Sequence, residues 1–189
     1  MAYSTNTNKE KVFTSTLWAN LFKSKPTQSE IENLLLSIPP FEKFNKAAMK
    51  NFIQLIHHRS YAANEIIFAQ GDPGIALYII QDGLIKIVKD DEHGNQYTLA
   101  EFSRGDFFGE LALLDEDVRS ASAIAVQDSK IAVIFKPDLD YFIKKNPIKG
   151  IEILSGIAKI ISVRLRKIDN ELMNIIFNKN SKEGENVSD

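Results

Sequence analysis

The 189-residue chain contains no cysteine at all. This absence excludes disulfides and thiolate metal sites, and it suits a reducing compartment. The net charge is only -2, so no strong electrostatic field attracts nucleic acid or an anionic membrane. No apolar run reaches the ~20 residues that span a bilayer, and the N-terminus lacks the apolar core of a signal peptide. We therefore expect a cytoplasmic protein without a membrane span.

What remains is an ordinary globular composition. Apolar residues make up 44% of the chain and charged residues 25%. The length suits one domain with extensions, and at this size about 70% of the surface of the unfolded chain can be buried. We expect a single domain with a real core, preceded by a polar extension over residues 1–28 and followed by a polar, disordered tail over residues 178–189.

The extension carries one apolar cluster at helical spacing, which predicts a short amphipathic helix. Such a helix either docks on its own domain or serves as a docking peptide for a partner or a second subunit, and both interpretations stay open. The cluster consists of Val12, Phe13, Leu17, Trp18, Leu21 and Phe22.

The order of elements predicts an α+β fold that is mainly β. Helical spacing covers 29–58, with Thr27 or Ser29 as N-cap and a stop at Pro39-Pro40. Short apolar runs separated by turn signals then predict an antiparallel β-barrel or jelly roll over 59–136. Helical spacing resumes over 137–177, with a restart at Asn146-Pro147. The expected strands are Glu65–Gln70, Ala76–Gln81, Leu84–Lys89, Gln96–Phe102, Ser120–Val126 and Lys130–Phe135.

Two adjacent histidines, His57 and His58, are expected to end the second N-terminal helix. Neighbouring residues point about 100° apart on a helix, so one helix cannot direct both rings at one metal ion. Cations near a helix C-terminus are the simpler explanation. We predict no metal site.

The most specific motif runs from Gly105 to Ala121. Gly109 allows close approach of the backbone to a ligand, and the apolar run after Glu110 can form one helical turn whose free N–H groups suit an anion. Arg119 is a planar cation that can bind phosphate through two parallel hydrogen bonds. Glu110 beside such a site makes sense if the ligand carries hydroxyl groups next to its phosphate, as a ribose does.

This motif resembles the phosphate-binding cassette of cyclic-nucleotide-binding domains, as in protein kinase regulatory subunits and catabolite activator proteins. The family order Phe-Gly-Glu-Leu-Ala-Leu, a short loop, then Arg and small residues reads here as 108–113 and Arg119-Ser120-Ala121. Val118 stands where many members have proline. The turn at 71–74 and Gly83 are also similar to the early hairpin of the family. The resemblance implies a jelly roll that binds cAMP or cGMP.

The resemblance also implies a role for each residue of the motif. Glu110 would accept a hydrogen bond from the ribose 2′-hydroxyl, or would be only a favourable carboxylate in a first helical turn. Arg119 would pair with the phosphate, or would be a surface arginine that forms ion pairs with the acidic residues of the loop before it. Ser120 would touch the phosphate or a guanine, or would be a strand residue. The other implied ligand-contacting residues are Gly109, Leu111, Ala112 and Ala121, and, with barrel core as the plainer alternative, Ile87, Leu99 and Ala100.

The helices after the barrel are expected to couple binding to an output. Leu172, Ile175, Ile176 and Phe177 offer apolar groups for a lid over the base, and they equally fit a helix that forms a homodimer or packs on the barrel. The family's helix-turn-helix is not expected here, so neither is direct DNA binding. The output would then require an effector protein in trans. The basic residues of the last helix are interpreted as its solvated face: Lys159, Arg164, Arg166 and Lys167.

Two functions compete at this point. The first is a cyclic-nucleotide sensor that signals through a partner, and it needs no cofactor besides its ligand. The second is a ligand-free relative used as a dimerisation or scaffold module. The presence of both Glu110 and Arg119 favours the first. An enzyme is not predicted, because no nucleophile–base pair, metal cluster or nucleotide-hydrolysis motif stands out.

Overall fold

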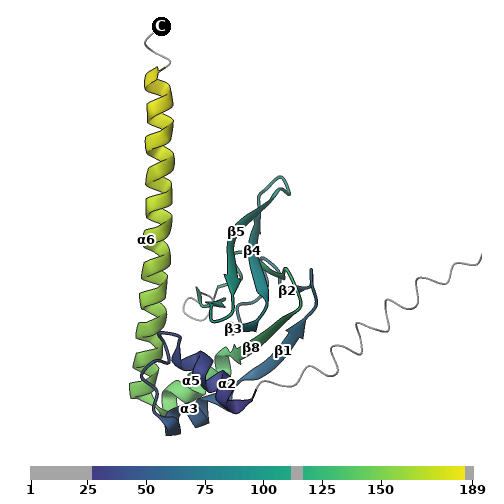
Figure 1. Ribbon diagram of the computed structural model, residues 1–189, viewed down its shortest axis with the longest axis vertical. Coiled ribbons are helices and arrows are strands. Elements are labelled where there is room, and N and C mark those ends of the chain that lie inside the picture. The colour runs from purple at the N-terminus through teal and green to yellow at the C-terminus, as the bar shows by residue number, and fades with distance from the viewer. Residues whose placement is uncertain (1–26, 112–116, 186–189) are drawn as a thin grey trace, which may run out of the picture.

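A β-barrel and a helical layer that ends in one long helix make up the fold (Figure 1). The computed structural model describes residues 27–111 and 117–185, with side chains up to residue 177. The amphipathic helix expected within 1–28 lies almost entirely outside the described residues. The fold class predicted from the sequence, mainly β with flanking helices, is confirmed.

The barrel consists of two antiparallel sheets of four strands each, in the orders β1-β8-β3-β6 and β2-β7-β4-β5. Strands β4 and β5 form the expected hairpin, with Ile87 opposite Ala100. β7 pairs with β4 and with the short β2. The strand bounds are His57–Tyr61 (β1), Ile66–Phe68 (β2), Ala76–Asp82 (β3), Leu84–Asp90 (β4), Gln96–Ser103 (β5), Phe107–Phe108 (β6), Ser122–Ala125 (β7) and Ser129–Phe135 (β8).

Two short helices precede the barrel, α2 (Gln28–Leu36) and α3 (Lys46–Ile53). Thr27 caps α2 in a capping box: its side chain accepts from the Glu30 amide while the Glu30 carboxylate accepts from the Thr27 amide. Asn45 caps α3 by a single bond, in which its side-chain Oδ1 accepts from the Ala48 amide. These caps explain why both helices begin where they do.

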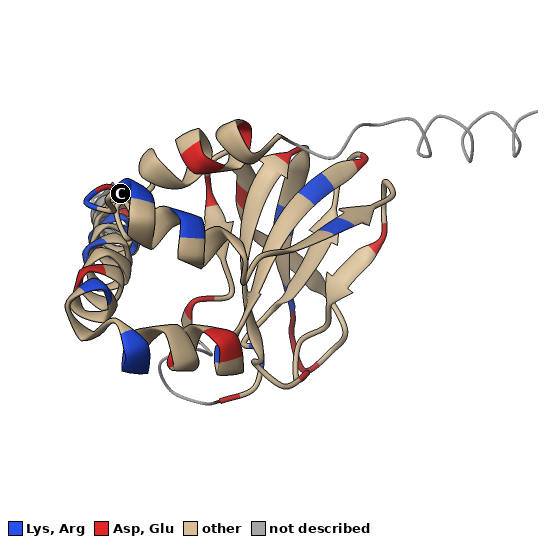
Figure 2. Ribbon diagram, turned by 90° about the horizontal axis from the view of Figure 1, so that it is seen from below, with Lys and Arg blue, Asp and Glu red and all other residues tan. Residues whose placement is uncertain are grey.

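Two helices follow the barrel, α5 (Lys136–Lys145) and α6 (Pro147–Glu185). The predicted restart at Asn146-Pro147 is confirmed, although the Asn146 side chain donates back to the Phe142 carbonyl of α5. Near its start α6 passes close to the segment after α2. The approach is so close that a Cβ at Gly156 would lie 2.4 Å from the Cα of Pro40. Seen along its axis, α6 lies on the helical side of the barrel (Figure 2).

The core has two parts on either side of one sheet. Residues of the helices pack with one face of β3 and β8 in the first part, which includes Phe41, Phe52, Ile153 and Ile157. The barrel interior forms the second part, around Phe108 and residues of β3, β7 and β8. The start of α6 is therefore anchored in the core, and its orientation is set by the helices beneath the barrel.

Three boundaries differ from the prediction. His57 and His58 begin strand β1, because α3 already ends at Ile53. β1 and the two-residue β6 were not expected, since neither has an alternating apolar pattern of useful length. Helix α6 continues to Glu185, so residues 178–185, which were expected to be disordered, are helical. Polar composition argues against burial of this stretch, but a helix already formed can extend through it.

Candidate functional site

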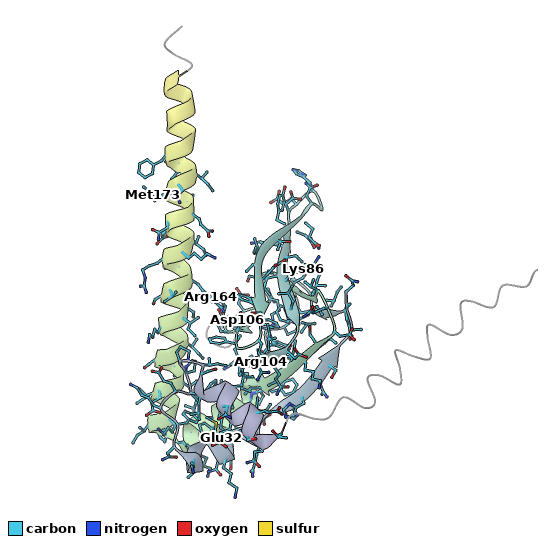
Figure 3. All side chains as sticks on the ribbon, viewed as in Figure 1. Glu32, Lys86, Arg104, Asp106, Arg164 and Met173 are labelled. Atoms are coloured by element: carbon cyan, nitrogen blue, oxygen red, sulfur yellow. The ribbon has the colours of Figure 1, made fainter. Side chains whose placement is uncertain are left out.

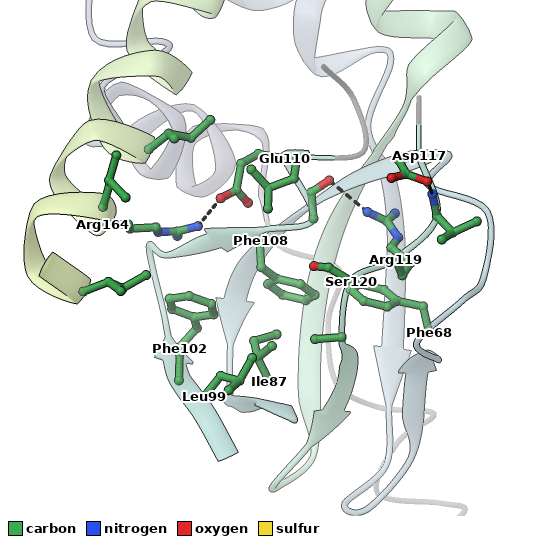
Figure 4. A pocket seen from close by; sticks show the side chains of 18 residues that line it. Phe68, Ile87, Leu99, Phe102, Phe108, Glu110, Asp117, Arg119, Ser120 and Arg164 are labelled. Atoms are coloured by element: carbon green, nitrogen blue, oxygen red, sulfur yellow. Dashed lines mark hydrogen bonds and ion pairs between the residues drawn. The ribbon is translucent and has the colours of Figure 1, made fainter. Parts of the chain in front are cut away.

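A cavity of about 390 Å³ lies between the β2-β7-β4-β5 sheet and helix α6 (Figure 4). The barrel wall is apolar at its base, where Ile87, Leu99 and Ala100 lie. The predicted phosphate-binding residues lie above them, and α6 forms the opposite wall. The lining residues are Phe68, Ile87, Leu99, Ala100, Phe102, Phe108, Gly109, Glu110, Leu111, Asp117, Val118, Arg119, Ser120, Ala121, Ile161, Arg164, Leu165 and Ile168.

Gly109 occupies the tightest position of this site. Its φ of +79° lies in the left-handed region, which a residue with a side chain rarely adopts. A Cβ at this position would lie 2.8 Å from the Arg119 guanidinium and 3.2 Å from the Ala76 carbonyl oxygen. The glycine therefore lets the chain turn, and it leaves room for the arginine beside it.

The turn after β2 fixes the backbone of Arg119. The Arg119 amide donates to the Asp72 carbonyl over 2.8 Å, and its carbonyl accepts from the Gly71 amide over 2.9 Å. Val118 pairs with Pro73 in an isolated bridge. The early turn that the sequence analysis noted thus places the arginine at the entrance of β7.

Arg119 is 4% exposed, and the hydrogen bonds of its side chain go to backbone carbonyls. Its Nη1 donates to the Gly109 carbonyl over 2.9 Å and its Nη2 to the Ala76 carbonyl over 2.7 Å, while its Nε has no partner. The guanidinium carbon lies 4.4 Å from the centre of the Phe68 ring. A buried cation whose hydrogen bonds go only to neutral carbonyls is costly unless an anion joins it.

Burial has the expected effect on the groups around this cation. Desolvation lowers the pKa of Arg119 below its ordinary value, and the neighbouring Tyr78 followed by the carboxylates of Glu110 and Asp72 act in the opposite direction. Desolvation likewise raises the pKa of Tyr78, and the charge of Arg119 partly offsets the rise. The tyrosine therefore stays neutral at physiological pH and does not neutralise the arginine.

Glu110 is also buried, at 5% exposure, but it has a partner. Arg164 of α6 donates from Nη1 to Glu110 Oε1 and from Nη2 to the Phe107 carbonyl, the latter over 2.6 Å. The Arg164 guanidinium also lies 4.7 Å from the centre of the Phe102 ring. One side chain of the long helix thus contacts the carboxylate, the strand before it and an aromatic ring of the cavity.

Most of the residues predicted from the sequence meet in this cavity. Gly109, Glu110, Leu111, Arg119, Ser120 and Ala121 line it from the predicted cassette, and Ile87, Leu99 and Ala100 line it from the barrel. Ala112 lies outside the described residues. The expected lid residues Leu172, Ile175 and Ile176 are exposed and do not line the cavity. The α6 residues that do so come earlier in the helix, from Ile161 to Ile168.

Arg164 is the cavity residue that sequence reasoning missed. Its position among other basic residues suggested a solvated helix face, whereas its guanidinium is directed to the cavity (Figures 3 and 4). No local pattern identifies it, because Glu110 lies 54 positions earlier in the chain. The one available signal was the apolar spacing of Ile161, Leu165 and Ile168 around it.

Other types of site are absent from the described part of the chain. No group of three or more His, Asp or Glu side chains there is arranged to hold a metal ion. No helix among the described residues is long and apolar enough to cross a membrane. Basic and acidic residues are interspersed along the ribbon in Figure 2.

Comparison with known proteins gives a family match for the barrel. Residues 58–146 match the family model of the cyclic nucleotide-binding domain. The cyclic AMP receptor protein of Thermus thermophilus is 36% identical over 120 residues, which are 64% of this chain and 54% of that protein. The cAMP-dependent protein kinase regulatory subunit of Aspergillus niger is 38% identical over 99 residues, which are 52% of this chain and 22% of that protein.

Solved structures agree on the fold. A crystal structure of a cyclic nucleotide-binding domain from Methylobacillus flagellatus superposes with a TM-score of 0.70 at 22% identity, covering 78% of this chain and 83% of that one. This chain spans about half of the receptor protein and about a fifth of the kinase subunit. The similarity therefore covers the barrel with its flanking helices, and not the whole of either relative.

Proposed function

We propose, on the premise that residues 58–146 form a cyclic nucleotide-binding domain, that this chain is a sensor of cyclic nucleotides. Its ligand would be cAMP, with cGMP as a second candidate, and it would act on a separate effector protein. The proposed activity is reversible binding and not catalysis, and it requires no cofactor. The effector in trans and the cytoplasmic location stay predictions of the sequence.

One observation carries the proposal: the Arg119 guanidinium is buried beside the cavity, donates only to neutral carbonyls and has an Nε without a hydrogen-bond partner. A cyclic phosphodiester carries one negative charge, and its two exocyclic oxygens suit a planar guanidinium. Binding would bring an anion to a cation that burial has already desolvated. Because that desolvation cost is met in the folded protein, the site is preorganised for the ligand.

Glu110 would supply recognition of the sugar. Its buried carboxylate is a hydrogen-bond acceptor, which suits the ribose 2′-hydroxyl and repels a second phosphate group. Arg164 occupies one of its oxygens, Oε1. The apolar residues at the cavity base, among them Ile87, Leu99 and Ala100, would contact the base and the ribose. These contacts are typical of a small-molecule site with few polar groups.

Arg164 would connect the ligand to α6. A ribose hydroxyl that donates a hydrogen bond to Glu110 would alter the hydrogen bonding of the carboxylate that Arg164 also contacts. The ligand would therefore bias the position of the helix. The sequence placed this coupling in the lid residues Leu172, Ile175 and Ile176, and they remain candidates only for a differently positioned helix. In the present arrangement the link runs through Arg164.

Isothermal titration calorimetry with cAMP and with cGMP tests the proposal. We expect a dissociation constant of about 1 μM or below for cAMP, which corresponds to ~8 kcal/mol of binding free energy. AMP is the control, because its phosphate carries an additional negative charge and an open geometry. Absence of binding heat and of any thermal shift at millimolar ligand, on folded protein, would contradict the proposal.

A ligand-free scaffold is the second candidate, and the Glu110–Arg164 pair is the observation that favours it. In a protein without a ligand, this pair would satisfy the buried carboxylate permanently. Arg119 argues against this function, since its side-chain hydrogen bonds go only to neutral carbonyls, and the charges of Glu110 and Asp72 offset its desolvation only in part. The same calorimetric experiment separates the two candidates.

A further inference from the structure

The Arg119 guanidinium lies over two aromatic rings of the barrel. Its central carbon is 4.4 Å from the centre of the Phe68 ring and 5.4 Å from the centre of the Tyr78 ring. The two ring centres are 5.3 Å apart. Figure 4 shows the Phe68 ring next to Arg119 in the wall of the cavity. The cation is therefore held by two backbone carbonyls and by aromatic carbon.

Strand pairing fixes the rings themselves. Tyr78 of β3 lies opposite Phe108 of β6, and side chains opposite each other in an antiparallel pair share one face of the sheet. Their rings are stacked, with centres 5.2 Å apart and planes inclined by only 9°. Phe68 is the last residue of β2, and its ring centre lies 5.9 Å from that of Phe108. The surface on which the guanidinium rests thus belongs to the packed interior of the barrel.

The hydrogen bonds of Arg119 leave one freedom that a ring can remove. A guanidinium has five N–H donors in one plane, and the Gly109 and Ala76 carbonyls accept from Nη1 and Nη2. These bonds act along the plane, so they resist a tilt of the plane only weakly. An aromatic ring beneath a desolvated cation attracts it and blocks such a tilt. The orientation matters, because a guanidinium binds two phosphate oxygens only when both lie near its plane.

We propose that Phe68 is a positioning residue for phosphate binding, whose ring holds the Arg119 guanidinium in the orientation that a cyclic phosphodiester requires. This inference rests on the proposed function, because it adds a residue to the same ligand site. Phe68 acts through Arg119, by setting the direction of the N–H groups that meet the exocyclic oxygens. In the sequence it was only one residue of an expected strand, Glu65–Gln70, and no part of the predicted site.

Phe68 also packs against the barrel core, so the test needs measurements that a loosened wall would leave unchanged. The first is nuclear magnetic resonance of the Arg119 side chain in the ligand-free full chain, with its signals assigned by their loss in Arg119→Lys. The ring current of Phe68 should shift these signals away from those of exposed arginines. We expect Phe68→Leu to remove most of the shift and Phe68→Tyr to keep it. Unchanged signals in Phe68→Leu overturn the proposal.

The second measurement uses the two phosphorothioate diastereomers of cAMP as probes. Each has sulfur, a weak hydrogen-bond acceptor, in place of a different exocyclic oxygen. A guanidinium with a fixed plane distinguishes the two positions, so the wild-type dissociation constants should differ at least about tenfold. In Phe68→Leu the ratio should fall to about threefold or less, while Phe68→Tyr keeps the wild-type ratio. A wild-type ratio near one, or a ratio that Phe68→Leu leaves unchanged, overturns the proposal.

Phe135→Leu is the matched control. Phe135 is also a partly buried aromatic residue packed on the barrel core, but its ring lies against His57, with centres 5.0 Å apart. We expect this variant to keep both the Arg119 signals and the diastereomer ratio. Phe68→Met, which also fills the space of the ring, replaces Phe68→Leu if the latter does not fold.

The outcomes separate this inference from the proposed function. A folded wild-type protein that does not bind cAMP contradicts the proposed function, and the positioning role with it. Binding of cAMP by the wild type, together with an equal loss of affinity for both diastereomers in Phe68→Leu, contradicts the positioning role alone. In that case the ring only closes the wall of the cavity.

Discussion

The two arginines of the cavity stand in opposite electrostatic surroundings. Arg119, on the barrel side, is buried and donates only to neutral carbonyls. Arg164, on the helix side, is partly exposed and is paired with the Glu110 carboxylate. Arg119 can therefore still accept an anion as a direct partner, whereas Arg164 already has one in Glu110. This difference separates a residue suited to ligand binding from a residue suited to joining the helix to the site.

The largest expected effect is the loss of binding in Arg119→Ala. Removal of the cation should weaken cAMP binding by ~2–5 kcal/mol, because the phosphate would be buried without its partner. Calorimetry measures the change directly. Arg119→Lys is the matched control: it keeps the charge but loses the planar fork, so we expect an intermediate affinity. An unchanged dissociation constant in Arg119→Ala would contradict the role given to this residue.

Gly109→Ala should be the most destabilising of the glycine substitutions near the site. Gly94 is its matched control, since both have a φ of +79° but a Cβ at Gly94 meets nothing within 4 Å. The left-handed conformation should cost each variant about 1 kcal/mol. The contact with Arg119 and Ala76 should add ~1–3 kcal/mol at Gly109 alone. Urea unfolding measures both, and equal midpoints would show that the close contact carries no cost.

Glu110→Gln should change recognition of the sugar more than overall affinity. The wild-type protein should prefer cAMP to its 2′-deoxy analogue, because the analogue has no hydroxyl to donate to the carboxylate. A neutral amide is a weaker acceptor, so the preference should shrink by about 1 kcal/mol. Competition titrations with both nucleotides give the ratio. If the variant discriminates as well as the wild type does, Glu110 does not contact the ribose.

Arg164→Ala should have the smallest effect on affinity. Arg164 does not contact the phosphate in the proposed site and the cavity keeps Arg119, so the loss of affinity should stay below about 1 kcal/mol. The larger change should appear in α6, where loss of the contacts with Glu110 and Phe107 should speed amide hydrogen exchange over 161–168. Lys167→Ala is the control, because its pair with Glu171 lies on the exposed surface of the same helix. Equal exchange in the two variants would argue against a coupling role for Arg164.

The sequence predicted those features that depend on residues close together in the chain. Thr27 was one of two N-cap candidates in the sequence, and the fold confirms it, in a capping box with Glu30 three residues later. The same holds for the restart at Asn146-Pro147 and for the cassette around Gly109 and Glu110. In each case the chemistry that specifies the structure lies within a few residues, and a pattern can record it.

Features that depend on distant partners could not be predicted in this way. β1 consists of polar residues and is a strand because β8 pairs with it. In the sequence Arg164 cannot be distinguished from the basic residues near it. Only the folded barrel brings Glu110 opposite to it. The position of the α6 residues at the cavity depends on how the helix leaves the core at Ile153 and Ile157, which no local spacing specifies. Tertiary packing determines all three.

The length of α6 has a mechanical consequence. With 39 residues in one uninterrupted helix, it spans about 58 Å, and a tilt of about 10° at its base would displace its far end by roughly 10 Å. The contact of Gly156 with Pro40 lies close to that base. A rearrangement of a few ångströms at the Glu110 carboxylate would therefore be magnified along a rigid lever, and a distant effector could sense it without touching the barrel.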